Sequence, residues 1–192
     1  MSGATRGDAA VFLDRDDTLM AARALPAPPP PAAPGDVVDP SLVRLLPGAL
    51  EGCVRLRRAG YRLVVVSNQG VVARGGATLE TVGRVNARLR ELLTDPAMGE
   101  GLIEAVYVCP FHPKGTVAEF AREHPWRKPG PGMIEAAARD LGLDLARSWL
   151  IGDAPRDIEA GVAAGLAADR CVLLGRDARD MPEAASRILA GR

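Results

Sequence analysis

The sequence has few cysteines and no long apolar run. Three scattered cysteines, Cys53, Cys109 and Cys171, form neither a dense disulfide framework nor a Cys-x-x-Cys pair, so we expect reduced thiols. The most apolar stretches, such as residues 63–66, are far too short to span a bilayer. The chain also opens without a basic segment followed by a long apolar run, which is the pattern of a signal peptide. We therefore expect a cytoplasmic protein that does not associate with membranes.

An excess of charge of either sign is also lacking, because 24 basic side chains balance 24 acidic ones. Such a chain has no broad positive surface for nucleic acid or an anionic membrane, so a few local cations would bind any phosphate that it handles. Its 192 residues, 47% of them hydrophobic, suit one globular domain with a real core and are few for two. We expect a single domain over 1–192, acting as a monomer without a nucleic-acid partner.

Short apolar runs alternate with helical patterns along the chain. Five runs with little polar alternation favour strands that are covered on both faces, as in a parallel sheet: 10–13, 62–66, 103–108, 149–152 and 171–174. Apolar spacing together with proline and glycine signals predicts five helices: 48–59, 78–93, 131–141, 156–164 and 182–190. Repeated strand–helix units predict an α/β fold, with one doubly wound, mainly parallel sheet and an active site at the carboxyl ends of its strands.

A proline-rich segment, residues 25–36, interrupts this pattern. It is too rich in proline for a helix or a central strand, so we expect an extended polyproline-like loop inserted into the domain. Two interpretations remain, a solvated loop or a PxxP ligand for a partner, and no second signal supports the ligand. Because the segment closely follows the first predicted strand, it could cover a site at the end of that strand.

An acidic cluster lies directly after the first predicted strand. Asp14, Asp16 and Asp17 place three carboxylates within four residues, where they repel one another. A bound cation would stabilise them, and hard oxygen ligands suit Mg²⁺. The alternative is an acidic turn that caps a following helix, and the cluster alone does not decide between the two.

Polar residues also occur near the ends of other strands and in the loop before the third predicted helix: Ser67, Asn68, Arg127, Lys128, Asp153 and Asp157. Each of them alone could be a helix cap or a turn residue. Together they would bring a carboxylate nucleophile, neutral donors, cations and a second metal carboxylate to one edge of the sheet. One site explains them all.

In their order, these motifs resemble those of the haloacid dehalogenase superfamily of phosphohydrolases. DRDDTL at 14–19 is similar to its DxDxT motif, SNQ at 67–69 to its second motif, RKPGPGM at 127–133 to its lysine motif, and GDAPRD at 152–157 to its closing acidic motif. Within the superfamily, FLDRD, VVVSNQGVVARG, CPFHPKGTVAEF and RKPGPGM look most like the compact histidinol-phosphate and heptose 1,7-bisphosphate phosphatases. The resemblance runs from about Val11 to Leu174 and implies a Rossmann-like sheet without a large cap domain.

The resemblance implies a magnesium-dependent phosphatase that forms an aspartyl phosphate. Carried over by position, it makes Asp14 the nucleophile and Asp16 the acid that protonates the leaving oxygen and then activates water. Mg²⁺ would be held by the Asp14 carboxylate, the Asp16 main-chain carbonyl and Asp153. The resemblance therefore assigns the acidic cluster to the chemical step itself.

Other implied roles concern the phosphate. Thr18 would order the loop, while Ser67, Asn68 and Lys128 would bind the phosphoryl oxygens, whose negative charge must be stabilised in phosphoryl transfer. For Asp157 three roles remain open: support of the metal, support of Lys128, or the cap of the helix that begins beside it.

The substrate class follows from the same resemblance. Arg127 would contact the substrate beyond the transferred phosphate, because the arginine fork suits a second phosphate. Arg74 is a further candidate, with a solvated charge at a helix entry as the alternative. We expect a sugar bisphosphate such as D-glycero-D-manno-heptose 1,7-bisphosphate; histidinol phosphate and a polynucleotide end are the alternatives.

Asp17 departs from the resembled motif, which has glycine at this position. Either the turn forms without a positive φ, or the site gains a negative charge. Activity could suffer from this change. A catalytically weak phosphosugar-binding or regulatory protein is therefore kept as an alternative of another class.

The loop before the lysine motif also departs from its look-alikes, which often carry a zinc site of Cys-x-His and Cys-x-Cys. Only Cys109 matches; Phe111, His124 and Trp126 stand at the other three positions, and His112 is shifted by one. A closed zinc site needs four nitrogen or sulfur ligands, and this loop offers at most three. We expect the chain to fold without structural zinc, with apolar packing of the two rings holding the loop. A degenerate site completed by water or a nearby acid is the alternative.

Overall fold

One parallel sheet organises the chain, whose computed structural model describes residues 8–97 and 99–191. The sheet has the strand order β5-β2-β1-β6-β7, and every neighbouring pair is parallel. Its strands are β1 (Ala10–Leu13), β2 (Arg62–Asn68), β5 (Ile103–Cys109), β6 (Trp149–Gly152) and β7 (Cys171–Leu173). From β1 the order continues to β2 on one side and to β6 on the other, so the crevice between β1 and β6 is the switch point at which such sheets bind ligands.

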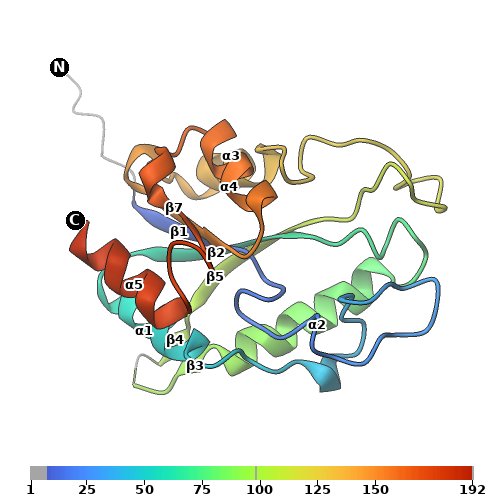
Figure 1. Cartoon of the computed structure of the whole chain (residues 1–192), viewed down its shortest axis with the longest axis horizontal. Coiled ribbons are helices and arrows are strands. Elements are labelled where there is room, and N and C mark those ends of the chain that lie inside the picture. Colours follow the sequence, from blue (N-terminus) through green and yellow to red (C-terminus); the bar gives the residue numbers. More distant parts are fainter. Residues whose placement is uncertain (1–7, 98, 192) are drawn as a thin grey trace.

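Helices cover both faces of the sheet (Figure 1). On one face lie α1 (Ala49–Arg58), α2 (Leu79–Leu92) and α5 (Met181–Ala190); on the other lie α3 (Gly132–Leu141) and α4 (Pro155–Ala163). Alternate residues of one strand enter the two cores: Val11 and Leu13 face the first group of helices, whereas Phe12 packs with the second. Burial on both faces explains why the strands are apolar without alternation.

The five predicted main strands and five predicted helices are confirmed, with ends that differ by at most two residues. The largest difference is in β2, where Ser67 and Asn68 are its last residues instead of following it. A two-strand hairpin of β3 (Thr94–Asp95) and β4 (Glu100–Gly101) was not predicted, because strands this short carry no periodicity. Short 3₁₀ turns lie at Pro40–Leu42, Leu145–Arg147 and Ala168–Arg170.

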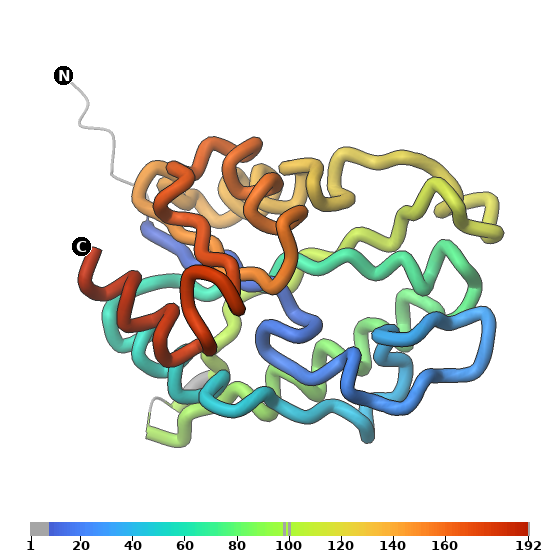
Figure 2. Tube along the Cα trace, viewed as in Figure 1, coloured from blue at the N-terminus to red at the C-terminus, as the bar shows by residue number. Residues whose placement is uncertain are grey.

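Apart from this sheet and its helices, the described residues form only the hairpin, 3₁₀ turns and loops, so no large cap domain covers the sheet. In the same residues, no helix combines the length and the apolar character needed to cross a membrane. The connections after β1, β2 and β5 instead extend beyond the sheet on one side, as the tube in Figure 2 shows.

The proline-rich segment contains no helix or strand, as predicted, but the expectation of an extended conformation throughout is wrong. Turns interrupt it between residues 29 and 35. Its end is fixed by Asp36, which accepts hydrogen bonds of 2.8 and 2.7 Å from Arg74 Nη2 and a further bond from the Ala33 N–H. Its backbone at Ala32 packs so closely on Gly76 that an added Cβ would lie 2.7 Å from the Ala32 nitrogen. The segment is therefore docked beside the carboxyl ends of the strands; whether it binds a partner stays open.

Candidate active site

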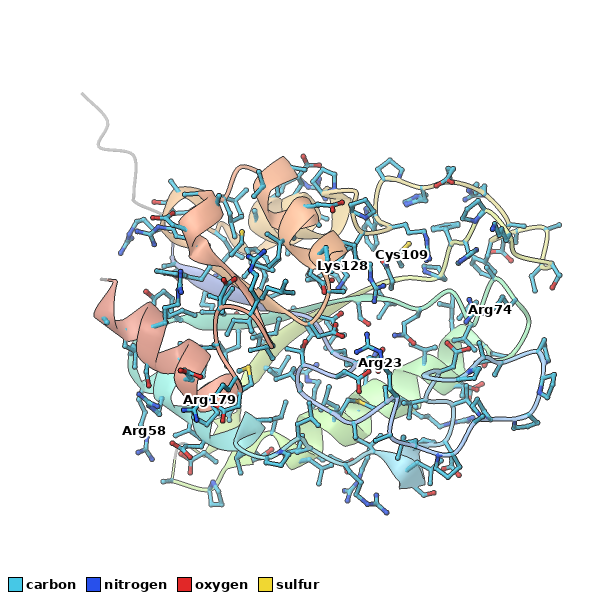
Figure 3. All side chains as sticks on the ribbon, in the orientation of Figure 1. Arg23, Arg58, Arg74, Cys109, Lys128 and Arg179 are labelled. Atoms are coloured by element: carbon cyan, nitrogen blue, oxygen red, sulfur yellow. The ribbon has the colours of Figure 1, made fainter. Side chains whose placement is uncertain are left out.

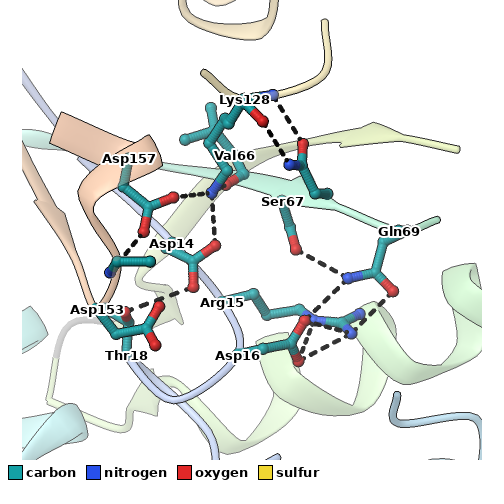
Figure 4. A network of polar contacts seen from close by, with 12 residues as sticks. Asp14, Arg15, Asp16, Thr18, Val66, Ser67, Gln69, Lys128, Asp153 and Asp157 are labelled. Carbon is teal, nitrogen blue, oxygen red and sulfur yellow. Dashed lines mark hydrogen bonds and ion pairs between the residues drawn. The ribbon is translucent and has the colours of Figure 1, made fainter. Parts of the chain in front are cut away.

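Asp14 and Asp153 lie at the switch point of the sheet, each directly after the last residue of its strand (Figure 4). The Asp14 N–H donates to the Ile151 carbonyl at 2.9 Å, which continues the ladder between β1 and β6 for one residue. Asp14 is 5% exposed. The register of two central strands therefore fixes the position of both carboxylates.

Lys128 is the cation at the centre of this site. Its Nζ lies 2.6 Å from Asp14 Oδ1, 2.8 Å from Asp157 Oδ1 and 2.7 Å from the Val66 carbonyl oxygen, so three acceptors surround its three protons. Burial opposes the charge of Lys128, but the two carboxylates outweigh it and raise its pKa. A buried ion pair of this kind is costly to break from one side, since the remaining charge is left without a partner.

Asp157 performs two of the three roles left open for it. Besides its ion pair with Lys128, its Oδ2 accepts the Ala154 N–H at 3.0 Å and caps α4. Its side chain passes directly over Gly152, where any added side chain would overlap it. Glycine in the GDAPRD motif therefore permits the close approach of this carboxylate to the end of β6.

Three carboxylates of the site lie close enough together to hold a cation. Asp14, Asp153 and Asp157 each offer an oxygen within 4.8 Å of the others, and no other group of three possible ligands is found among the described residues. The pKa of Asp14 is raised to about 7, and burial is the largest cause. The charges of Asp157 and Asp16 also raise this pKa, whereas Lys128 lowers it. Carboxylates that repel one another in a buried site favour a hard divalent cation with oxygen ligands, such as Mg²⁺.

The site carries an excess of negative charge in its ion pairs. Its contacts join five carboxylates to three cations, which leaves two negative charges when all are ionised: Asp14, Asp16, Asp17, Asp153 and Asp157 with Arg15, Arg23 and Lys128. One atom is also prepared for a ligand. Asp153 Oδ1 is buried and has no hydrogen-bond partner in the described structure, although a buried carboxylate oxygen normally has one.

Asp16 lies outside the group of three carboxylates, held by residues to which sequence analysis gave no role. Arg15 donates to both of its oxygens at 3.1 and 3.0 Å, and Gln69 Nε2 donates at 3.0 Å. Arg15 is itself fully buried and bound to Gln69 Oε1 and to Asn86 Oδ1 of α2. The sequence did offer a signal for Arg15, an arginine between two carboxylates directly after a buried strand. Its partners Gln69 and Asn86, however, are distant in the sequence.

Asp17 adopts a positive φ of 57°, which rules out the first of the two alternatives, a turn without one. Aspartate tolerates this region better than most residues because its short side chain bonds locally. Here Oδ1 accepts the N–H groups of Ala22 and Arg23 at 3.0 and 3.1 Å. The site does gain the predicted negative charge, but the Arg23 guanidinium lies beside it, with 3.4 Å between Nε and Asp17 Oδ2.

The neutral residues predicted to bind phosphate lie at the site, and each of them already has a hydrogen-bond partner. Ser67 Oγ accepts from Gln69 Nε2 at 2.9 Å. The Asn68 amide pairs with the Lys128 peptide group in both directions, at 3.0 and 2.9 Å, and so holds the lysine loop. Thr18 is buried with its Oγ1 3.5 Å from Asp14 Oδ2. Their contacts with a phosphate stay a prediction.

Two predicted substrate arginines converge around Gly70. Arg74 Nη1 and Arg127 Nη1 both lie within 3.4 Å of the position that a Gly70 Cβ would take, as does His112 Cδ2. Burial lowers the pKa of Arg127, and the positive charges of Arg156 and Arg74 act in the same direction. The alternative of a solvated charge for Arg74 is wrong, because it is partly buried and paired with Asp36.

A cleft of about 260 Å³ opens above Asp16. Its walls come from the acidic loop, the end of the proline-rich segment, the end of β2 and the start of α4: Asp16, Asp17, Arg23, Pro34, Gly35, Asp36, Asn68, Gln69 and Arg156. The proline-rich segment thus does cover part of the site, as its position in the sequence suggested.

Comparison with known sequences identifies the family to which this chain belongs. Over 182 residues the chain is 32% identical to the D-glycero-beta-D-manno-heptose-1,7-bisphosphate 7-phosphatase of Yersinia pestis, an alignment that covers 95% of this chain and 89% of that protein. The chain belongs to the haloacid dehalogenase-like family of phosphatases. The family and enzyme class predicted from its motifs are confirmed.

Further comparisons agree with this assignment. The sequence model of the HAD-hydrolase-like family matches residues 125–187 of the phosphatase. A relative from Mesorhizobium japonicum, with the same name as the Yersinia protein, is 37% identical over 158 residues, which are 82% of this chain and 66% of that one. The structure of D,D-heptose 1,7-bisphosphate phosphatase from B. bronchiseptica, complexed with magnesium and phosphate, superposes with a TM-score of 0.73 at 25% identity, covering 96% of this chain and 99% of that one. The predicted fold class is thereby confirmed.

Aromatic rings pack against one another in the loop before the lysine motif, where the look-alikes often carry a zinc site. The Phe111 ring stacks on His124 with centroids 4.1 Å apart and planes at 13°, and His124 meets Trp126 edge-on. Trp126 also meets Tyr107 edge-on. The predicted packing of Phe111 and Trp126 is therefore present, with His124 between them. Nδ1 of His124 accepts the Trp126 N–H, so this nitrogen is not available to a metal.

We expect the purified phosphatase to contain far less than one zinc per chain. The residues of this loop do not fit a closed zinc site, because ring stacking and a main-chain hydrogen bond engage His124. Elemental analysis of protein purified without added metal measures the content, and a strong zinc chelator should leave the melting temperature unchanged. Stoichiometric zinc that is lost in a Cys109→Ser variant would contradict this expectation.

Proposed function

We propose that this phosphatase hydrolyses a sugar bisphosphate in a Mg²⁺-dependent reaction through an aspartyl phosphate on Asp14, with D-glycero-D-manno-heptose 1,7-bisphosphate as the substrate. The observation that carries the proposal is the pairing of Asp14 with Lys128 beside Asp153, whose Oδ1 is buried and has no hydrogen-bond partner among the described residues. The names of its relatives support the substrate class. When bound by Asp14 and Asp153, Mg²⁺ would neutralise negative charge on the phosphoryl group and on the attacking carboxylate.

In the first step an oxygen of Asp14 attacks phosphorus. A bond forms between this oxygen and phosphorus while the bond from phosphorus to the sugar oxygen breaks, and Asp16 gives its proton to the leaving oxygen. Lys128 stabilises the charge on the phosphoryl oxygens, because its ammonium group already lies 2.6 Å from the nucleophile. In the second step Asp16 takes a proton from water, the water oxygen attacks phosphorus, and Asp14 leaves as inorganic phosphate forms.

The position of Asp16 suits this acid and base role. It lines the cleft, and its side chain is 23% exposed. Arg15 and Gln69 restrict its rotation through bonds to both oxygens. A catalytic group held in this way loses little conformational freedom when the substrate binds.

A second phosphate would find cations near Gly70. Arg127 and Arg74 present guanidinium nitrogens there, and the exposed Arg156 lines the cleft close by. Arg74 is oriented by Asp36, so the proline-rich segment would contribute indirectly to substrate recognition. Arginine binds phosphate through two parallel donors, which favours a bisphosphate over a small neutral ester.

Phosphate release from a panel of phosphorylated metabolites tests this function. We expect activity only with added Mg²⁺, and the highest kcat/KM on heptose 1,7-bisphosphate in a panel that includes histidinol phosphate, an oligonucleotide with a terminal phosphate and an aryl phosphate. A higher kcat/KM on histidinol phosphate or the oligonucleotide would replace the proposed substrate. No turnover of any ester with Mg²⁺ would instead indicate a phosphosugar-binding protein.

We expect Arg127→Ala to lower kcat/KM for the bisphosphate far more than for the aryl phosphate, by roughly tenfold to a hundredfold against less than about threefold. The physical reason is that only the bisphosphate carries a second anionic group within reach of this arginine. Lys114→Ala, which removes an exposed cation from the same loop, serves as the control. Equal losses on both substrates would rule out the positioning role of Arg127.

A further inference from the structure

The two oxygens of Asp153 have different surroundings. Oδ1 is buried without a hydrogen-bond partner in the described structure, whereas Oδ2 accepts from Arg23 Nη2 at 2.7 Å. The carboxylate as a whole is 7% exposed. A hydrogen bond to one oxygen of a buried carboxylate fixes the direction in which the other oxygen points.

Arg23 is itself held from the opposite side. The Nε of its side chain lies 3.4 Å from Asp17 Oδ2, and its main-chain N–H donates to the same carboxylate. Asp17 is fixed in turn by its positive φ and by the Ala22 N–H. Asp17, Arg23 and Asp153 therefore form a chain of contacts that crosses from the loop after β1 to the end of β6. In Figure 3, Arg23 is drawn near the middle of the molecule, below Lys128.

We propose that Arg23 is a positioning residue, which aims Asp153 Oδ1 at the divalent cation, and that Asp17 anchors Arg23 for this purpose. The proposal rests on the proposed function, since it assumes that Asp153 binds the cation. It also gives a role to the aspartate that replaces the glycine of the resembled motif. The extra negative charge at position 17 is not a defect of the site, because it holds the arginine that orders a metal ligand.

Two effects of Arg23 on a cation oppose each other. Its positive charge repels the cation, whereas its hydrogen bond orders the ligand. The side chain of Arg23 is 65% exposed, so water and salt screen the repulsion, while the hydrogen bond acts directly at 2.7 Å. Removal of a residue that orients a metal ligand typically weakens metal binding by about tenfold to a hundredfold. The ordering effect should therefore dominate.

Titration calorimetry with Mg²⁺ alone, without substrate, tests the proposal. We expect Arg23→Ala to raise the Kd for Mg²⁺ about tenfold. Arg23→Lys should raise it nearly as much, because a lysine keeps the charge but cannot reach both carboxylates with a fork. The matched control is Arg179→Ala. Arg179 and Arg23 line one cavity of about 420 Å³ beside Asp153, but Arg179 pairs with Glu183. Its Kd should equal that of the wild type.

A double-mutant cycle tests the anchor. Asp17→Gly should weaken Mg²⁺ binding less than Arg23→Ala, and the double variant should bind no more weakly than Arg23→Ala alone, since both act through one contact chain. Melting temperatures without metal should stay near that of the wild type, which shows that the variants are folded. Additive losses in the cycle would rule out the anchoring role.

The outcomes separate this inference from the proposed function. Wild-type protein that binds no Mg²⁺, or binds it as weakly as Asp153→Asn, would overturn the metal site itself. Wild-type binding that needs Asp153 but is equal or tighter in Arg23→Ala would overturn only the positioning role. A wild-type Kd in Arg23→Lys would show that charge alone matters, which also contradicts the proposal.

Discussion

Replacement of Asp14 with asparagine should lower kcat by more than about a thousandfold and leave the fold intact. An amide has nearly the shape of a carboxylate but is a poor nucleophile, so the chemical step fails while the packing at the end of β1 is kept. Lys128 would still pair with Asp157 and bond the Val66 carbonyl, so its buried charge keeps partners in the variant. This is why a loss of turnover should not be accompanied by unfolding.

Phosphate release on the best substrate, together with circular dichroism and the melting temperature, measures both parts of this prediction. Asp169→Asn, which neutralises an exposed carboxylate in the 3₁₀ turn before β7 and so at the amino end of that strand, is the matched control and should retain wild-type activity. An Asp14→Asn variant with more than about a tenth of wild-type activity would show that Asp14 is not the nucleophile.

Asp16→Asn should also abolish turnover, but with a different signature. The amide cannot accept a proton from water, so hydrolysis of the aspartyl phosphate should slow by about a hundredfold to ten-thousandfold. An aryl phosphate needs little help from an acid, because its leaving group is stable as an anion. On that substrate we expect a burst of about one product per active site followed by a stop, as a covalent intermediate accumulates.

Mass spectrometry of the intact variant after rapid quenching detects this trapped intermediate. On a sugar phosphate, whose leaving oxygen needs a proton, the burst should be absent. The double variant Asp14→Asn with Asp16→Asn is the control and should show no phosphoenzyme on either substrate. Undiminished turnover in Asp16→Asn, without trapping, would remove the acid and base role of Asp16.

Much of the fold could be predicted from the sequence because its signals are local. Apolar runs such as 10–13 without polar alternation indicate strands buried on two faces, and the two cores on either side of β1 confirm this. Pro131 and Pro182 marked the starts of α3 and α5, and Gly60 and Gly165 the ends of α1 and α4, within about two residues. The small hairpin was not predictable because its strands are too short to carry a periodicity, and the turns of the proline-rich segment were not because that segment is held by contacts with Arg74 and Gly76.

The candidate site, like the fold, could be predicted from the sequence only in part. Motif order could nominate Asp14, Lys128 and Asp153 because the carboxyl ends of parallel strands must meet at one edge of the sheet. It gave no role to Arg15 or Arg23. Arg15 finds partners directly after β2 and on α2, and Arg23 binds a carboxylate 130 residues away. Spacing along the chain does not encode such contacts.

The sequence by itself determined the succession of strands and helices, the chemical groups at the strand ends and the family of the phosphatase. Only the tertiary structure decided which oxygen of each carboxylate is engaged. It turned Asp16 toward Arg15 and paired the unusual Asp17 with Arg23, and within 8–97 and 99–191 it left Asp153 Oδ1 without a hydrogen-bond partner. The physical reason is that the direction of a side chain depends on packing and hydrogen bonds between distant segments, whereas residue type and periodicity are properties of the chain alone.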